Sequence, residues 1–212
     1  MRAFLTGTDT GVGKTFVTAL LTRALRRAGC GTVALKPLCC GERDDVEILR
    51  NASGCTLTAD QTNPVWFKTP ACPLVAARVE KQAVLLDALQ LWFSTLAASH
   101  KSLLVEGAGG WLVPLTDTET LADLAVRFAL PVIPVVANRL GCINHTLLTL
   151  ESIRARRLEC PGIILNNSTP PADPAAQTNR AILSSLTNVL LEIHPGQTEI
   201  PAPELKKFFL LH

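Results

Sequence analysis

Nine consecutive residues near the start of the chain have the types and spacing to bind phosphate: Gly7-Thr8-Asp9-Thr10-Gly11-Val12-Gly13-Lys14-Thr15. They follow a short apolar run and open a stretch of helical periodicity, the context of a phosphate-binding loop. Its glycines let backbone N–H groups point inward without a Cβ clash, and the helix starting near Gly13 adds its positive end. In such a loop Lys14 bridges the β- and γ-phosphates, and the Thr15 hydroxyl coordinates Mg²⁺. The residues expected to bind a nucleotide here are Thr8, Asp9, Gly11, Val12, Gly13, Lys14 and Thr15.

The spacing of this loop departs from the common form. In G-x-x-x-x-G-K-[ST] a glycine lies six residues before the lysine, but that position is Thr8 here, and Gly7 lies one residue earlier. We therefore expect a slightly longer loop, in which Thr10 and Gly11 project toward whatever the γ-phosphate meets. The alternative is an ordinary glycine-rich turn, which the Gly-Lys-Thr triplet and its flanks disfavour.

Three further positions could complete a site for a magnesium nucleotide. Lys36 ends an apolar run, where it is either solvated or a second cation for phosphate; its place beside a phosphate loop favours the second. Asp44 and Asp45 precede a helical stretch, and either could cap the helix or bind the metal. Glu106 ends the run Leu103-Leu104-Val105 before four flexible residues. It is the best second carboxylate, because Mg²⁺ prefers oxygens from one or two acids, water and phosphate.

Two later junctions also place polar groups after apolar runs. The stretch Asn138-Arg139-Leu140-Gly141-Cys142-Ile143-Asn144-His145 joins a strand to a helix whose first N–H groups are unpaired and could bind a carboxylate. Plain turn chemistry with Asn144 as a cap explains the spacing equally well, and His145 is expected to pack or cap. Asn166 and Asn167 end the next strand, where a side-chain amide could pair with a purine edge.

All these residues fall where an apolar run ends, which predicts how they are positioned. Strands are predicted over 3–6, 32–36, 102–106, 132–137, 162–166 and 189–193, and helices over 14–28, 44–53, 83–99, 119–129, 143–158 and 174–187. This alternation predicts a single-domain α/β fold, and the phosphate loop at its start makes it one of the P-loop NTPase type. Its central sheet is mostly parallel, helices cover both faces, and ligands bind at the carboxyl ends of the strands. The least regular segment, 51–73, could hold an edge strand at Val65-Trp66-Phe67 or a lid.

Length and composition agree with one domain over residues 1–212. Apolar residues make up 48% and charged residues 18%, which excludes a disordered chain. A net charge of +2 gives no support for nucleic acid, and the longest apolar run, 130–137, is too short to cross a bilayer. No signal peptide is recognisable, so we expect a soluble cytoplasmic protein with no membrane or nucleic-acid partner. The seven cysteines form no C-x-x-C or Cys/His grouping, which predicts reduced thiols.

Taken together, these pieces resemble dethiobiotin synthase, an ATP-dependent ligase family of biotin synthesis. The loop alone would indicate only an NTPase, whereas Glu-Gly-Ala-Gly-Gly and Leu-Gly-x-Ile-Asn-His make the match specific. Besides the loop with its longer spacing, the shared motifs are Lys36-Pro37, Val105-Glu106-Gly107-Ala108-Gly109-Gly110-Trp111, Leu140-Gly141-Cys142-Ile143-Asn144-His145 and Asn166-Asn167-Ser168-Thr169-Pro170-Pro171.

The resemblance implies a homodimer that carboxylates 7,8-diaminononanoate with CO₂ and closes the ureido ring with ATP and Mg²⁺, through a carbamate and a carbamic-phosphoric anhydride. By position, it implies that Thr10, Lys14 and Lys36 hold the carbamate and γ-phosphate. Thr15, Asp45 and Glu106 would hold Mg²⁺, and Asn166 would face the adenine. The substrate carboxylate would meet the partner subunit's helix start, formed by Gly141, Cys142, Ile143 and Asn144. Cys40 would also contact substrate, where a hydroxyl residue is expected after the Lys-Pro pair.

Two other classes of protein share the phosphate loop. A MinD/ParA-type switch ATPase carries an additional lysine early in the loop, where this chain has Asp9. The tail favours that alternative, since Leu205, Phe208 and Phe209 would form an apolar helix face beside two lysines, as in a membrane-surface anchor. We expect this face to pack on the protein's own core instead, because the segment is short and weakly basic. A ligase domain of cobyrinic acid amidation would normally be fused to a glutaminase, for which 212 residues leave no room.

Overall fold

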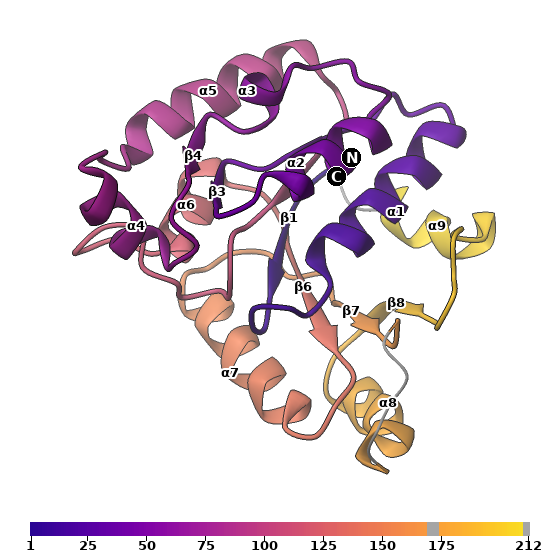
Figure 1. Ribbon diagram of the computed structural model, residues 1–212. Helices are drawn as coiled ribbons and strands as arrows, with labels where there is room; N and C mark the ends of the chain where they lie inside the picture. Colours follow the sequence, from indigo (N-terminus) through magenta and orange to yellow (C-terminus); the bar gives the residue numbers. More distant parts are fainter. Residues whose placement is uncertain (169–173, 210–212) are drawn as a thin grey trace.

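A parallel sheet forms the centre of the fold in the computed structural model, which describes residues 1–168 and 174–209 (Figure 1). In this part of the chain the sheet has six strands in the order β2-β5-β1-β6-β7-β8, every neighbouring pair parallel. The strands are β1 (Arg2–Gly7), β2 (Val33–Leu35), β5 (Leu103–Glu106), β6 (Val132–Ala137), β7 (Ile163–Asn166) and β8 (Val189–Ile193). Their nearly unbroken apolar runs are typical of strands buried on both faces.

Helices cover both faces of this sheet, as predicted. They are α1 (Lys14–Arg27), α2 (Asp44–Ala52), α3 (Ala59–Thr62), α4 (Pro73–Glu80), α5 (Leu86–Ser99), α6 (Leu121–Phe128), α7 (Cys142–Ala155), α8 (Ala175–Leu186) and α9 (Ala202–Phe209). Neighbouring strand residues alternate between the faces: Leu103 and Val105 pack in the cluster with α5 and α6, whereas Leu104 packs in the cluster with α1. Helices α7 and α8 cover β6 and β7 on the first of these faces.

The irregular segment 51–73 is more ordered than its sequence suggests. The predicted strand at Val65–Phe67 exists as β4, but it pairs with β3 (Leu38–Cys40) in a separate parallel ladder and not with the main sheet. Short α3 precedes it, with a capping box between Thr58 and Gln61. Helix α4, which we did not predict, begins at the end of this segment with Pro73 in its first turn. The helix predicted over 83–99 begins later, at Leu86.

The C-terminal helix packs on the body of the protein. Leu205 and Phe208 are buried in the same cluster as residues of α1 and β8, and Figure 1 shows α9 beside α1. The expectation that this face packs on the protein's own core is confirmed for these two residues; the side chain of Phe209 lies outside the described part. Within the described residues, no helix is both long and apolar enough to span a membrane.

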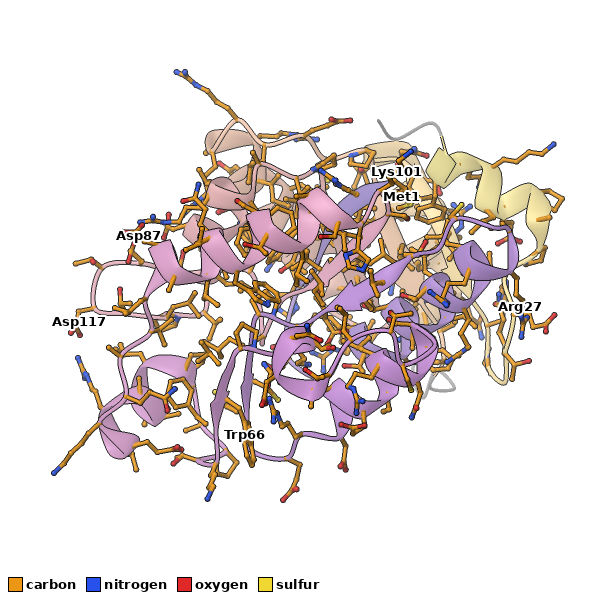
Figure 2. The ribbon with its side chains drawn as sticks, turned by 90° about the horizontal axis from the view of Figure 1, so that it is seen from above. Met1, Arg27, Trp66, Asp87, Lys101 and Asp117 are labelled. Carbon is orange, nitrogen blue, oxygen red and sulfur yellow. The ribbon has the colours of Figure 1, made fainter. Side chains whose placement is uncertain are left out.

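This arrangement separates the two ends of the sheet. Met1 and Lys101 precede β1 and β5, and they lie close together in Figure 2; the backbone N–H of Leu103 donates to the carbonyl of Met1. At the opposite end the same strands finish at Gly7 and Glu106. The phosphate loop and the predicted site residues that follow β2, β5, β6 and β7 therefore meet at the carboxyl edge of the sheet.

Candidate active site

The phosphate loop, residues 7–13, connects β1 directly to α1. Gly13 has a φ of 85°, and a Cβ added there would lie 2.2 Å from Asn166 Nδ2, so only glycine fits. The same Nδ2 atom donates to the Val12 carbonyl at 2.8 Å, and the Thr8 N–H donates to the Val135 carbonyl at 3.2 Å. The end of β7 and the middle of β6 thus hold the loop in place.

A cleft of about 760 Å³ opens beside this loop. Besides the loop, it is lined by the residue that follows β2, by β3, by the first turn of α2, by residues 70–73, and by the end of β5 with the glycine-rich stretch after it. Nine of the residues predicted from sequence line it: Thr10, Gly11, Gly13, Lys14, Thr15, Lys36, Cys40, Asp45 and Glu106. The chain therefore brings the predicted phosphate, metal and carbamate residues together, although they come from four separate segments.

The centre of the cleft is a buried charge cluster. Lys36 Nζ donates to Asp45 Oδ2 at 2.5 Å and to Glu106 Oε1 at 2.7 Å, and Thr15 Oγ1 donates to the same Glu106 oxygen at 2.7 Å. Glu106 is 0% exposed and Lys36 4% exposed. Burial alone would lower the pKa of Lys36, but the two carboxylates outweigh it and raise the pKa, so the ammonium stays charged. Burial would raise the pKa of Asp45, but Lys36 outweighs it and lowers that pKa.

Lys14 lies in the same cleft but differs from Lys36 in its contacts. Its Nζ donates to the Asp9 carbonyl at 3.4 Å and makes no ion pair with a carboxylate in the described residues. Burial lowers the pKa of Lys14, and the attraction of Glu106 offsets this only in part. Its charge is accordingly available to a bound anion.

The oxygen atoms of this cluster suit a magnesium ion. Among the described residues Glu106 Oε2 is buried without a hydrogen-bond partner, which is unusual for a charged oxygen and fits a cation at this position. Thr15, Asp45 and Glu106 offer hard oxygen donors, the kind that Mg²⁺ prefers. Asp45 is half-buried and lines the cleft, whereas Asp44 is exposed, so of the two alternatives only Asp45 is in place. Among the described residues no group of three or more His, Cys, Asp or Glu could hold a metal, so phosphate oxygens would have to complete its shell.

The predicted carboxylate site at the start of α7 lies outside this cleft. None of Gly141, Cys142, Ile143 and Asn144 lines it. Gly141 caps α7 with a φ of 87° and no side chain caps the helix, so Asn144 is not the cap that the alternative required. The helix start is open to other molecules, since Gly141 and Asn144 are exposed.

Asn166 lies behind the phosphate loop. Besides its bond to Val12, its Oδ1 accepts from the Ser168 N–H at 3.0 Å. Within the described residues these bonds use one amide hydrogen and one oxygen lone pair, so the other of each could meet a ligand. The motif continues through Thr169, Pro170 and Pro171, which lie outside the described residues.

The phosphate loop also forms an ion pair that was not predictable from the sequence. Arg139 Nη2 donates to Asp9 Oδ2 at 2.6 Å and joins the phosphate loop to the residues before α7. The two residues are 130 positions apart, and only the adjacency of β1 and β6 brings them together. Their opposite charges at two strand ends were the available signal, but the order of the strands could not be read from the sequence.

Comparisons with known proteins show which chains are related to this one. A family model described as an AAA domain matches residues 1–194. The chain is 44% identical over 200 residues to the ATP-dependent dethiobiotin synthetase BioD of Akkermansia muciniphila, covering 93% of this chain and 94% of that protein. It is 46% identical over 189 residues to the protein of the same name from Anaeromyxobacter sp. (strain K), covering 87% and 85%.

Solved structures of low sequence identity share the fold. The cell division ATPase MinD of Pyrococcus furiosus superposes with a TM-score of 0.58 at 17% identity, over 97% of this chain and 88% of that chain. A plasmid partition protein of Borrelia burgdorferi bound to AMPPNP gives 0.56 at 9% identity, over 99% and 96%. At such identities the likeness extends to the fold alone.

Proposed function

The chain belongs to the dethiobiotin synthetase family, and from this we propose that it carboxylates 7,8-diaminononanoate with CO₂ and closes the ureido ring using ATP. The ATP-dependent role in biotin biosynthesis follows from membership of the family. The steps and the residue roles below are our proposal for this chain.

The observation that carries the proposal is the convergence of two buried lysines and two carboxylates on one cleft beside the phosphate loop. Lys14 and Lys36 supply positive charge, and Asp45 and Glu106 supply metal ligands. A simple nucleotide hydrolase needs the loop and the metal, whereas a second buried lysine suits a further anion. The carbamate formed from an amine and CO₂ is such an anion.

In the first step one amine of the substrate attacks CO₂ and loses a proton, which gives a carbamate. A carbamate oxygen then attacks the γ-phosphorus of ATP, and ADP leaves. Both reactants are anions, so the positive charges of Lys14 and Lys36 would offset their repulsion, and Thr10 would help to hold them. The product of this step is a carbamic-phosphoric anhydride.

In the second step the other amine of the same substrate attacks the anhydride carbon, expels inorganic phosphate and closes the ring. No protein nucleophile is required, because the attacking amine is already held on the same molecule. Cys40 lines the cleft. Burial, and to a smaller extent the neighbouring thiols, raises the pKa of its own thiol to about 12. It therefore contacts substrate as a neutral thiol, a weaker hydrogen-bond donor than a hydroxyl.

Thr15, Asp45 and Glu106 would hold Mg²⁺ together with the β- and γ-phosphates. When bound, the ion offsets the negative charge on the phosphate oxygens during transfer. On the protein side, the loop N–H groups orient the phosphates, and Asn166 would face the adenine with its remaining donor and acceptor.

We further propose a homodimer in which Gly141 to Asn144 of one subunit receive the substrate carboxylate bound in its partner. The positive end of the α7 dipole would attract an anion, although the Cys142 N–H already donates to the Arg139 carbonyl at 3.1 Å; this helix start lies outside the subunit's own cleft. Apolar side chains are exposed around it, namely Leu140, Leu147 and Leu148. A second copy covering this face would bury them. We place the reaction in the cytoplasm, because all seven cysteines are free thiols, as a reducing compartment favours.

The alternative of a switch ATPase was favoured by the apolar face of the C-terminal tail, and the two described side chains of that face are not exposed. Leu205 and Phe208 of the tail are buried against the protein's own core, where they are unavailable to a membrane. The likeness to MinD and to the plasmid partition protein concerns the fold only.

The test is the release of inorganic phosphate from ATP, measured with and without 7,8-diaminononanoate and bicarbonate, with the organic product identified by mass spectrometry. We expect release to require both co-substrates and to match the dethiobiotin formed. Release that is unchanged when diaminononanoate is left out would contradict the proposal and support a switch ATPase.

A further inference from the structure

Lys36 occupies the two carboxylates that the proposed function assigns to Mg²⁺. Its ammonium lies 2.5 Å from Asp45 Oδ2 and 2.7 Å from Glu106 Oε1, and these acids come from the start of α2 and the end of β5. One ammonium thus joins two separate elements at the edge of the sheet. A metal held by Asp45 and Glu106 would compete with this ammonium for the same two side chains.

The protein needs a cation at this position when no metal is present. Glu106 is completely buried, and a buried carboxylate without a counter-charge is strongly destabilising. Lys36 is the one side-chain cation bonded to Glu106 in the part of the chain that the structure describes. Thr15 also donates to Oε1, but a hydroxyl cannot balance the charge.

From this geometry we propose that Lys36 is a placeholder for the metal: it holds Asp45 and Glu106 in the nucleotide-free protein and yields them to Mg²⁺ when the nucleotide enters. The released ammonium then becomes available to the carbamate. This inference rests on the proposed function, because it takes the metal and carbamate sites from there. It adds an order of events, in which Lys36 reaches the substrate only after the metal has taken its place.

The inference makes a prediction about metal binding that needs no catalysis. In the wild-type protein a metal must compete with Lys36 for the two carboxylates, so binding of Mn²⁺ in the absence of nucleotide should be weak. In a Lys36→Met chain the carboxylates have no bound cation, and Mn²⁺ affinity should rise by about tenfold or more, since a hydrogen bond between charged groups no longer opposes it. Electron paramagnetic resonance of free Mn²⁺ measures this directly.

Two matched variants separate occupation of the site from simple loss of charge. Lys14→Met removes a positive charge from the same cleft, but Lys14 bonds to the Asp9 carbonyl and not to either carboxylate. Its effect on Mn²⁺ affinity should be much smaller than that of Lys36→Met. Lys36→Arg keeps a cation at the position and should remain close to the wild type.

Stability provides a second readout. Without metal, Lys36→Met should melt at a lower temperature than the wild type, and millimolar Mn²⁺ should restore most of the loss while barely affecting the wild type. Lys36→Gln is the milder variant, because its amide is polar and leaves the carboxylates in a less apolar environment than methionine does. If neither variant folds even with Mn²⁺ while Lys14→Met does, the cation at this position is not exchangeable and the inference is wrong.

The outcomes distinguish the inference from the function on which it rests. Equal Mn²⁺ affinities in Lys36→Met and the wild type, or equal gains in Lys36→Met and Lys14→Met, would overturn the placeholder role alone. If the wild type with ADP binds no more Mn²⁺ than ADP alone, or if Glu106→Gln binds it as tightly as the wild type, the proposed metal site itself fails.

Discussion

Glu106 sets the electrostatics of the cleft at the scale of single residues. Its buried carboxylate is matched by Lys36, while Lys14 remains without a carboxylate bonded to it in the described residues. The two lysines therefore have different partners in the cleft. Lys36 bonds to the two acids, whereas Lys14 remains available for phosphate, as its position in the loop predicts.

Replacing Lys14 should test that division. We expect Lys14→Ala to fold normally and to lose turnover by ~10²-fold or more, because one preorganised charge is removed from the phosphate site. Steady-state kinetics and circular dichroism measure the two effects. Lys101→Ala is the control, since this exposed lysine lies at the opposite end of β5 (Figure 2) and should leave activity unchanged. Near-normal turnover in a folded Lys14→Ala protein would remove the phosphate-loop assignment.

Cys40 offers a prediction that depends on pH. Burial, with Cys39 and Cys72 nearby, raises its pKa to about 12, and only the thiolate is alkylated. A raised pKa means that the thiolate is scarce at neutral pH and increases about tenfold for each pH unit up to the pKa. We expect iodoacetamide to modify exposed Cys55 long before Cys40, with the Cys40 rate rising steeply with pH. Peptide mass spectrometry resolves the two sites, and equal rates at neutral pH would contradict the burial argument.

Single residues differ in how far sequence alone could place them. Lys36 and Glu106 were predictable because each ends an apolar strand, and the ends of parallel strands meet at one edge. Asp45 could not be told from Asp44, since both precede the same helix and only the turn of α2 directs one of them into the cleft. Asp9 and Arg139 could not be paired at all, because that contact depends on strand order.

Helices and strands were predictable from the sequence wherever a regular pattern of apolar residues extended over the whole element. The six strands of the sheet were recognisable because buried parallel strands are continuously apolar. In the segment 51–73 only the strand at Val65–Phe67 was suggested by sequence. Helix α3 is too short to show a period, and the partner of β4 was not predictable because the β3–β4 ladder joins strands separated by more than twenty residues. Its order comes from tertiary contacts, such as the bond from Trp66 Nε1 to the Gly41 carbonyl at 2.8 Å.

Helix α9 belongs to the core and should contribute to stability. Leu205 is 3% exposed, so Leu205→Ala should lower the free energy of unfolding by about 2–5 kcal/mol, the usual cost of a large cavity. Deleting residues 204–212 should lower the melting temperature further. Lys206→Ala is the matched control, because Lys206 is exposed on the same helix and should change stability by less than about 0.5 kcal/mol.

Helix α9 is also the segment that could bind a membrane surface, and this can be tested. With its apolar face buried, the full chain should stay in solution when mixed with anionic liposomes and ATP. Co-sedimentation that requires ATP and disappears on deletion of residues 204–212 would show that α9 leaves the core, and it would restore the switch alternative.

At the scale of the whole molecule, each subunit holds two separate parts of the proposed site. The phosphate loop opens on the cleft, while the start of α7 lies outside it and is bordered by exposed leucines. The Asp9–Arg139 ion pair joins the loop to the residues before α7 within one chain. If sites are shared between subunits, each loop is therefore linked to the helix start that serves the other site.

Mixed dimers test whether the sites are shared. A Lys14→Ala chain lacks the loop function, and a Gly141→Trp chain blocks the helix start; each homodimer should be inactive. Gly141 is exposed, and an added Cβ would meet only His145, at 3.9 Å, although its φ of 87° will strain any other residue. In a mixed dimer one site has the altered loop of the first chain and the blocked helix start of the second. The other site has the intact loop of the second chain and the intact helix start of the first.

Random mixing of equal amounts should thus recover about a quarter of wild-type activity, because half of the dimers are mixed and each has one intact site out of two. A chain carrying both substitutions, mixed with Lys14→Ala chains, offers no sound site and should recover nothing. Mixed dimers that form, as native mass spectrometry would show, yet remain inactive would place each site within a single subunit.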